Sequence, residues 1–443
     1  MAGEPEEFAL PLSRAANERL HAMVPGGAHT YAKGDDQYPE GLAPVISHGR
    51  GAHVWDVDGN RYVEYGSGLR SVSLGHAHPR VTEAVRRELE RGGNFVRPSV
   101  VEIEAAERFL ATVPTAEMVK FAKNGSDATT AAVRLARAAT GRARVAICAD
   151  HPFFSTDDWF IGTTPMADGI PPATAALTVR FPYGDLPATE ELLSRYEGEV
   201  ACLILEPATQ TEPPPGYLTG LRALADRHGC LLVLDEMITG FRWSEAGAQS
   251  LYGVVPDLST FGKALGNGFA VAALAGRREL MERGGLRHSG DRVFLLSTTH
   301  GAETHALAAA TAVQTTYTEE GVTARLHALG ERLAAGVREA AASMDVADHV
   351  LVRGRASNLV FATLDEHGRP SQEYRTLFLR RLLAGGVLAP SFVVSAALDE
   401  ADIDHTVEVV AQACAVYRKA LDAGDPTPWM GGRAVRPVFR RRA

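Results

Sequence analysis

The sequence predicts an α/β fold: a large domain with a mostly parallel central sheet covered by helices, and a smaller, discontinuous α/β domain. Two observations support this. Short apolar runs alternate with helical patterns through the middle of the chain, and 443 residues are too many for one ordinary core. The pattern changes after Thr311, so we expect residues 1–75 and 312–443 to form the small domain and 76–311 the large one.

The first elements are predicted from periodicity and turn residues. Apolar and polar residues alternate from Val54 to Tyr65 around Asp58-Gly59, which indicates a β-hairpin. Apolar residues recur at helical spacing from Pro79 to Leu110, with an interruption near Gly92-Gly93. A hairpin followed by two helices is therefore expected here.

The sheet of the large domain is predicted from four apolar runs. They cover residues 118–122, 144–148, 200–205 and 231–234. Two helices are also expected in this part of the chain, one that ends at Ala138 and one over 217–228. Towards the C-terminus, one long amphipathic helix is expected over Ala312–Ser343 and another over Glu400–Ala423.

Composition excludes several classes of protein. The net charge is −9, and basic residues gather only in the last few positions, which we interpret as a docked or solvated tail rather than a nucleic-acid arm. The four cysteines form no CxxC pair, so we expect buried thiols and no metal site. No apolar stretch of about 18 residues occurs, and the first twelve residues are acidic rather than signal-like, so we expect a cytoplasmic protein without a membrane span.

Asp235 directly follows the apolar run Leu231–Leu234. Ligands of open parallel sheets bind at the carboxyl ends of strands. A carboxylate at this position suits a protonated ring nitrogen, such as the pyridine of pyridoxal 5′-phosphate (PLP). By itself, this pattern equally fits a helix cap or a metal ligand.

Lys263 lies between an apolar approach and a glycine-rich turn, in the segment Ser259–Gly266. Among protein side chains, an amine is what forms a Schiff base with an aldehyde, and it must be neutral to do so. The alternative is a surface lysine in a loop, but the neighbouring Phe, Gly and Leu argue against a solvated face.

Gly125-Ser126 opens a predicted helix. A glycine allows a phosphate to approach the backbone, and the N-terminus of the helix offers free N–H groups. A simple N-cap by Ser126 is the alternative. The order of glycine turn, strand-end aspartate and lysine favours the phosphate site.

The chain resembles fold-type I PLP enzymes of the class III aminotransferase family, in its glutamate-1-semialdehyde aminomutase-like branch. The resemblance covers nearly the whole chain. It is carried by LVLDEMITGFRWSEAGAQSLYGVVPDLSTFGKALGNG (Leu232–Gly268), MVKFAKNGSDATTAAVRLARAATGR (Met118–Arg142), LGHAHP (Leu74–Pro79), VPGG (Val24–Gly27) and DEADIDHTV (Asp399–Val407).

The resemblance implies a role for each matching residue. Lys263 holds the cofactor as a Schiff base and moves a proton, and Asp235 pairs with the pyridine nitrogen. Met237 lies against the ring, and Gly125 and Ser126 hold the phosphate. In TTHGAETHALAAA, Thr299 matches a threonine that reaches the phosphate of the neighbouring subunit, which implies a homodimer with shared active sites.

The chain departs from the family pattern on the substrate side. Where an aromatic ring usually stacks on the cofactor, the chain has Asp150-His151-Pro152-Phe153-Phe154, so Phe153 or Phe154 is the candidate, unless both pack in the core. The segment after Glu206 is short, leaving Thr209, Gln210 and Glu212 as candidates for the phenolic oxygen. Phe392–Leu398 lacks the acid that guards an aminomutase site.

Two arginines are candidates for substrate contact. Arg70 follows the hairpin and Arg97 lies in NFVRPS, and either could instead form a structural ion pair. With the cofactor residues kept and the substrate side changed, we expect an aminotransferase of specialised biosynthesis with an amino acid donor and a keto or aldehyde acceptor. The alternatives are a glutamate-1-semialdehyde aminomutase or related isomerase, and a non-catalytic binding subunit.

Overall fold

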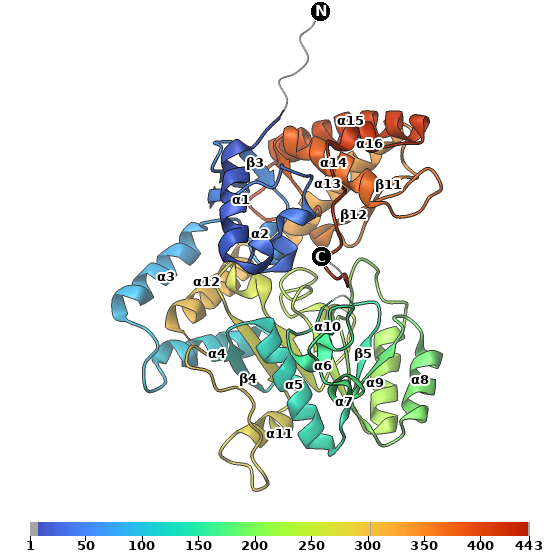
Figure 1. Cartoon of the computed structure of the whole chain (residues 1–443). Helices are drawn as coiled ribbons and strands as arrows, with labels where there is room; N and C mark the ends of the chain where they lie inside the picture. Colours follow the sequence, from blue (N-terminus) through green and yellow to red (C-terminus); the bar gives the residue numbers. More distant parts are fainter. Residues whose placement is uncertain (1–7, 152, 302, 442–443) are drawn as a thin grey trace, which may run out of the picture. The chain divides into compact units, whose positions relative to one another are not determined.

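The computed structural model describes residues 8–151, 153–301 and 303–441 (Figure 1). The chain divides into two compact units. The larger one comprises Gly68–Ser73 and His78–Ala324, and the smaller one comprises Met1–Ser67, Leu74–Ala77 and Arg325–Ala443. The domain boundaries expected after residues 75 and 311 stay a prediction.

The larger unit contains a seven-stranded sheet with the order β4-β10-β9-β8-β7-β5-β6. All neighbouring strands are parallel except β10, which runs antiparallel to both β4 and β9. The predicted mostly parallel sheet is thus confirmed. The strands are β4 (Met118–Ala122), β5 (Arg144–Cys148), β6 (Thr178–Phe181), β7 (Val200–Leu205), β8 (Leu231–Asp235), β9 (Leu258–Phe261) and β10 (Ala272–Gly276).

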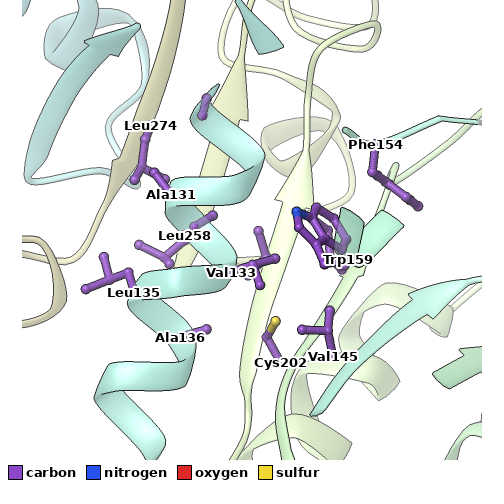
Figure 2. Packing of buried hydrophobic residues seen from close by; sticks show 14 of the residues in the cluster. Ala131, Val133, Leu135, Ala136, Val145, Phe154, Trp159, Cys202, Leu258 and Leu274 are labelled. Atoms are coloured by element: carbon purple, nitrogen blue, oxygen red, sulfur yellow. The ribbon is translucent and has the colours of Figure 1, made fainter. Parts of the chain in front are cut away.

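Both faces of this sheet are buried, because alternate side chains of the central strands belong to two different cores. One face packs against α5 (Gly125–Thr140), and Figure 2 shows Val133 of this helix lying close to Val145 and Cys202 of the strands. The other face packs against α8 (Leu186–Arg195) and α9 (Tyr217–His228). Continuous apolar runs are the expected signature of strands covered on both sides.

The remaining helices of the larger unit include the two expected before the sheet. The predicted interruption near Gly92-Gly93 is confirmed, since α3 ends at Arg91 and Gly92 has a φ of 86°. These helices are α3 (Pro79–Arg91), α4 (Val100–Thr112), α6 (Asp158–Ile161), α7 (Pro172–Ala175), α10 (Ala248–Leu251), α11 (Arg278–Met281) and α12 (Thr304–Glu320), with the 3₁₀ turn η5 (Glu282–Gly284).

The prediction of a single long helix over Ala312–Ser343 was wrong. Helix α12 ends at Glu320 and α13 (Val322–Ser343) begins two residues later. Gly321 between them has a φ of 61°, in the left-handed region that terminates helices and favours glycine. Apolar periodicity continues across the break, which is why the pattern did not reveal it.

The smaller unit joins both ends of the chain. The predicted hairpin is confirmed by the antiparallel pair β2 and β3, and β13 adds to β3 in parallel, with Val387 opposite Val63. The elements are α1 (Pro11–Met23), η1 (Pro25–Gly27), η2 (Tyr31–Lys33), η3 (Asp35–Gln37), β1 (Ile46–Arg50), β2 (His53–Asp56), β3 (Arg61–Glu64), β11 (Val350–Arg353), η6 (Ala356–Asn358), β12 (Val360–Thr363), α14 (Gln372–Ala384), β13 (Val387–Leu388), α15 (Glu400–Ala423) and α16 (Thr427–Met430).

The basic C-terminal segment packs within the smaller unit, with contacts that extend to an ion pair between Arg440 and Asp36. The N–H of Arg433 donates to Glu40 Oε2 at 2.8 Å, and the N–H of Arg436 donates to the Asp36 carbonyl at 3.0 Å. All four cysteines are buried and free, as expected. Every helix in the described part of the chain is too short or too polar to span a membrane.

Candidate active site

The candidate site lies at the edge of the sheet where the parallel strands end. Asp235 is the last residue of β8, Glu206 directly follows β7, and Lys263 lies two residues beyond the end of β9. Leu205 pairs with Leu234, and Asp235 pairs with Thr260. Because neighbouring parallel strands end at one edge, the fold brings together three ionisable groups that are far apart in the sequence.

Asp235 is only 3% exposed, and one of its two carboxylate oxygens is committed. Its Oδ1 accepts hydrogen bonds from the Met237 N–H at 3.0 Å and from Thr260 Oγ1 at 3.2 Å. Burial raises the pKa of Asp235 to about 6, although Lys263 and these two donors oppose the rise. No described residue donates a hydrogen bond to Oδ2, which leaves this oxygen available to a ligand.

Lys263 opens a short 3₁₀ turn, η4 (Lys263–Gly266), with a φ of 44°. A side chain other than glycine's is strained in this left-handed region, and such strain is concentrated at functional sites. Burial lowers the pKa of Lys263, while Asp235 and Glu206 oppose the decrease. Within the described residues its amine makes no hydrogen bond and no ion pair. These features suit an amine that must become neutral to react.

Gly125 and Ser126 occupy the first turn of α5. Asn124 and Asp127 form a capping box there, and Ser126 Oγ accepts a hydrogen bond from the Thr156 N–H at 3.0 Å. The amides of Gly125 and Ser126 donate to no acceptor in the described parts of the chain, as expected for the first turn of a helix. Two free N–H groups at a helix N-terminus are the usual cradle for a phosphate.

Met237 connects this helix N-terminus to the lysine turn. It is 6% exposed. A Cβ atom placed on Gly125 would lie 3.0 Å from Met237 Sδ, and one on Gly262 would lie 2.6 Å from the same atom. The glycines are therefore needed for the close approach of this side chain, and Gly125, Met237 and Lys263 lie in one small region.

Arg70 also belongs to this cluster, whereas Arg97 does not. The pKa of Arg70 is lowered by burial and raised again by Glu206, and the charge of Arg70 in turn affects Lys263. Arg97 is exposed and shows no hydrogen bond or ion pair with any described residue. The structure thus brings only one of the two predicted arginines to the lysine.

An unusual backbone carries Arg70. The four residues of α2 (Ser67–Arg70) all have positive φ values, between 44° and 73°. Each non-glycine residue in this region costs about 1–2 kcal/mol. Ser71 Oγ donates to the Gly68 carbonyl at 2.7 Å, and Arg242 Nη2 donates to the Arg70 carbonyl at 3.0 Å. These bonds stabilise a turn that the sequence alone did not indicate.

The two candidate aromatic residues lie in different environments. Phe154 is 2% exposed and belongs to the core beside α5, where Figure 2 shows it near Trp159. Phe153 is 42% exposed, with its ring edge-on to Phe160 at 5.5 Å. Of the two, only Phe153 has a ring accessible to a ligand.

His151 and Glu206 are site residues that the sequence reasoning missed. His151 Nδ1 accepts the Glu206 N–H at 3.0 Å, and burial lowers the pKa of His151 to about 4, so the ring is neutral with its proton on Nε2. Glu206 is 5% exposed, and burial followed by repulsion from Asp235 raises its pKa to about 8. The signal was present, because Glu206 follows its apolar run as Asp235 does.

The other candidates near the site are more exposed. Gln210 and Glu212 are exposed and Thr209 is half-buried, and Glu212 accepts a hydrogen bond from Tyr252 Oη. Thr299 is exposed in the segment before α12. Lys123, directly before the α5 cap, forms an ion pair with Glu303 of the same segment.

The residues present fit PLP. Asp235 Oδ2 is available to a pyridinium N–H, the Gly125 and Ser126 amides are available to a phosphate, and the Lys263 amine is available to an aldehyde. The absence of a Cβ on Gly125 and Gly262 lets Met237 pack between the helix N-terminus and the lysine turn. The pyridine nitrogen, the phosphate and the aldehyde of the cofactor therefore each have a matching protein group in one region of the larger unit.

Comparisons with known proteins agree with this geometry. The family model "Aminotransferase class-III" matches residues 36–393. A protein of Chloroflexus aggregans named glutamate-1-semialdehyde 2,1-aminomutase is 33% identical over 432 residues, which is 91% of this chain and 97% of that protein. A protein of the same name from Roseiflexus castenholzii is 35% identical over 425 residues, with the same coverage.

Solved structures show the same likeness. An omega-transaminase from Sphaerobacter thermophilus is 26% identical with a TM-score of 0.79, over 93% of this chain and 98% of that one. A transaminase with PLP bound is 25% identical with a TM-score of 0.84, over 94% and 99% of the two chains.

Proposed function

The chain belongs to the class-III aminotransferase family and is a PLP-dependent enzyme, and we propose that it transfers an amino group from an amino acid donor to a separate keto or aldehyde acceptor. The observation that carries the proposal is the cluster at the sheet edge. It keeps candidate groups for the aldehyde, the pyridine nitrogen and the phosphate of the cofactor, and it adds Arg70, whose charge acts on Glu206 and Lys263. The candidate cofactor residues are kept, whereas the substrate side departs from the family pattern and carries the charge of Arg70. This combination favours a changed substrate.

In this proposal, Lys263 holds the cofactor through its amine and moves a proton at the substrate α-carbon. Asp235 holds the proton of the ring nitrogen through Oδ2, and Gly125 and Ser126 bind the phosphate. Met237 and Phe153 contact the ring. When bound, PLP supplies the reactive aldehyde and an electron-withdrawing ring. Burial of these groups excludes water and strengthens their electrostatic interactions.

Arg70 is the proposed contact for a carboxylate of the donor. A guanidinium binds a carboxylate through two parallel hydrogen bonds, which fixes orientation as well as charge. A role for Arg97 at the substrate is the weaker proposal, since no described residue connects it to the cluster.

The second candidate function is intramolecular transfer by a glutamate-1-semialdehyde 2,1-aminomutase, or another isomerisation on the same scaffold. It is favoured by the curated relatives of that name, which match 91% of this chain. Against it, Phe392–Leu398 contains no acidic residue. An aminomutase benefits from such a gate because its intermediate must stay bound while the cofactor cycles.

Two assays separate the candidates. The purified holoenzyme is mixed with single amino acids, glutamate and glutamine first, and conversion of the bound cofactor to its pyridoxamine form is followed by absorbance. We expect conversion, and ping-pong kinetics once an acceptor is added. Efficient conversion of glutamate-1-semialdehyde to 5-aminolevulinate, with no amino acid producing the pyridoxamine form, would instead establish the second candidate.

We also propose a homodimer in which each active site uses both chains. Thr299 is exposed, as a residue that reaches a partner must be. Large apolar side chains of the same unit are exposed as well: Leu89, Phe95, Val96, Leu286 and Phe294. Exposed apolar side chains mark an interface where they form a contiguous patch, and these residues are the candidates for one. A cytoplasmic location is proposed from the four buried, free thiols.

A further inference from the structure

Glu206 is a buried carboxyl group for which the proposed function has assigned no role. It lies between the ends of β5 and β8, and its backbone is held on two sides. His151 Nδ1 accepts the Glu206 N–H at 3.0 Å, and Tyr183 Oη donates to the Pro207 carbonyl at 2.8 Å. The position of Glu206 is therefore set by side chains that follow two neighbouring strands.

The carboxylate of Glu206 is nevertheless uncommitted. No described residue makes a hydrogen bond or an ion pair to its oxygens. A second buried glutamate, Glu236, shows what a structural carboxylate looks like in this fold: it is fully buried and accepts the N–H groups of Ala248 and Gln249, both at 2.8 Å. A buried carboxylate without such donors is costly in its ionised form.

Three titratable or charged groups act on Glu206. Asp235 lies at the end of the neighbouring strand, Lys263 opens the η4 turn, and Arg70 belongs to α2. The thiol of Cys148 at the end of β5 is kept neutral by burial, which raises its pKa. Burial raises the pKa of Glu206 and lowers the pKa of Lys263, so the same buried environment favours the neutral form of both groups.

Asp235 is less suited to exchange a proton with Lys263. Two donors on its Oδ1 stabilise the ionised form, and Oδ2 is the proposed partner of the ring nitrogen. Of the two carboxylates next to the lysine, Glu206 is the one whose proton is free to move.

We infer that Glu206 is the proton-exchange partner of Lys263. One N–H bond of the lysine ammonium breaks and an O–H bond forms on the carboxylate, which leaves a neutral amine and a neutral acid. The reverse transfer follows when the amine is released from its Schiff base. The lysine makes no ion pair with Glu206 in this structure, so the proton passes on approach of the side chains or through one water. The inference rests on the proposed role of Lys263.

The test measures how fast the apoprotein forms a Schiff base with pyridoxal 5′-phosphate, by absorbance, between about pH 6 and pH 9. The variants are Glu206→Gln, Glu206→Asp and the control Glu245→Gln, a half-buried acid outside the cluster. We expect Glu206→Gln to be slower by about 10-fold or more near pH 7, with a deficit that shrinks at higher pH, because solvent then removes the proton. Glu206→Asp should recover part of the rate, and Glu245→Gln should match the wild type.

Two results would overturn the inference. One is a Glu206→Gln apoprotein with the rate and pH dependence of the wild type. The other is a loss of equal size at every pH together with a lower melting temperature, which indicates a structural role only. Lys263→Ala, run in parallel, separates this from the proposed function: if that variant still forms the Schiff base, the cofactor assignment of Lys263 fails instead.

Discussion

At the scale of single residues, the site depends on which ionisable groups the fold leaves without partners. Among the residues that the structure describes, none bonds to the second oxygen of Asp235 or to the amine of Lys263, whereas the adjacent Glu236 accepts two backbone donors. Residue type alone does not make this distinction, because Asp235 and Glu236 are neighbours in the chain and both are buried. The chemistry available at each position therefore depends on which of its polar atoms already have hydrogen-bond partners.

Asp235→Asn should retain the shape of the site and lose its electronic effect. An amide does not hold the ring nitrogen protonated, so the electron sink weakens. We expect the amino-acid half-reaction to slow by about 10³-fold, or about 4 kcal/mol in activation free energy. Stopped-flow absorbance under single-turnover conditions measures this rate. A variant within a few fold of the wild type would contradict the assignment.

Arg70→Met should weaken donor binding more than it slows the chemical step. Loss of a charged hydrogen-bonding partner should raise KM for a carboxylate-bearing donor by about 10- to 100-fold. Arg70→Lys keeps the charge without the planar fork, so it should fall between the two. Steady-state kinetics with a donor and with its decarboxylated amine provide the check. An equal loss for both substrates would point to a structural role for the arginine.

At the scale of elements, the left-handed α2 turn is the part of the site that is most costly in conformational energy. Its four residues cannot be relaxed independently, because Arg242 and Ser71 hold carbonyl groups at its end and middle. A strained backbone that persists is one that the surrounding structure over-determines. Here it positions the guanidinium of Arg70.

Gly68→Ala should disturb this turn and the donor site together. Gly68 has a φ of 54°, and an added Cβ would lie 2.8 Å from Val72 Cγ2. We expect a loss of about 1–3 kcal/mol in stability and a raised KM for the donor. Gly141→Ala is the matched control, since Gly141 has a φ of 68° with no atom within 4 Å of the added Cβ. That control should lose stability alone. Equal KM values for both variants would remove α2 from the substrate site.

At the scale of the whole molecule, two properties depend on many residues at once: the change of stability with pH and the proposed homodimer. Three buried carboxyls have raised pKa values, Asp235 to about 6, Glu236 to about 7 and Glu206 to about 8. Their ordinary values are 3.8 for Asp235 and 4.5 for the two glutamates. Between the two sets of values, the folded state binds more protons than the unfolded state.

The apoprotein should therefore become less stable as the pH rises from about 6 to about 8, because ionising these carboxyls costs more in the folded state. Below about pH 6.5 the lowered pKa of His151, about 4, opposes this trend, but one histidine offsets only part of the contribution of three carboxyls. Thermal melting at constant ionic strength measures the net slope. Glu206→Gln should flatten it between pH 6 and pH 8, and a melting temperature that rises over this range would contradict the burial of these acids.

Mixed dimers should reveal shared active sites. Lys263→Ala and Thr299→Val chains each damage both sites of their own homodimer, but a mixed dimer restores one site in which lysine and threonine are both intact. We expect random mixing to restore about a quarter of wild-type activity at limiting PLP. Unmixed preparations are the control. Sedimentation of a fully active monomer would refute the assembly.

The sequence by itself determined the class of fold and supplied the candidates for the cofactor residues. Apolar runs covered on both faces predicted the parallel sheet, and Asp235, Lys263 and Gly125-Ser126 stand at strand and helix ends that local patterns reveal. These features are short-range, since each needs only its own neighbours in the chain.

Only the tertiary structure decided what surrounds these groups. It showed that Gly321 separates two helices, that Phe154 is a core residue, and that the charge of Arg70 acts on the lysine. It also showed that Glu206 is buried without a hydrogen bond or ion pair from any described residue. Each of these depends on contacts between segments distant in sequence. The free energy of a buried charge depends on the groups that pack around it in space. The local periodicity of the sequence does not show which groups those are.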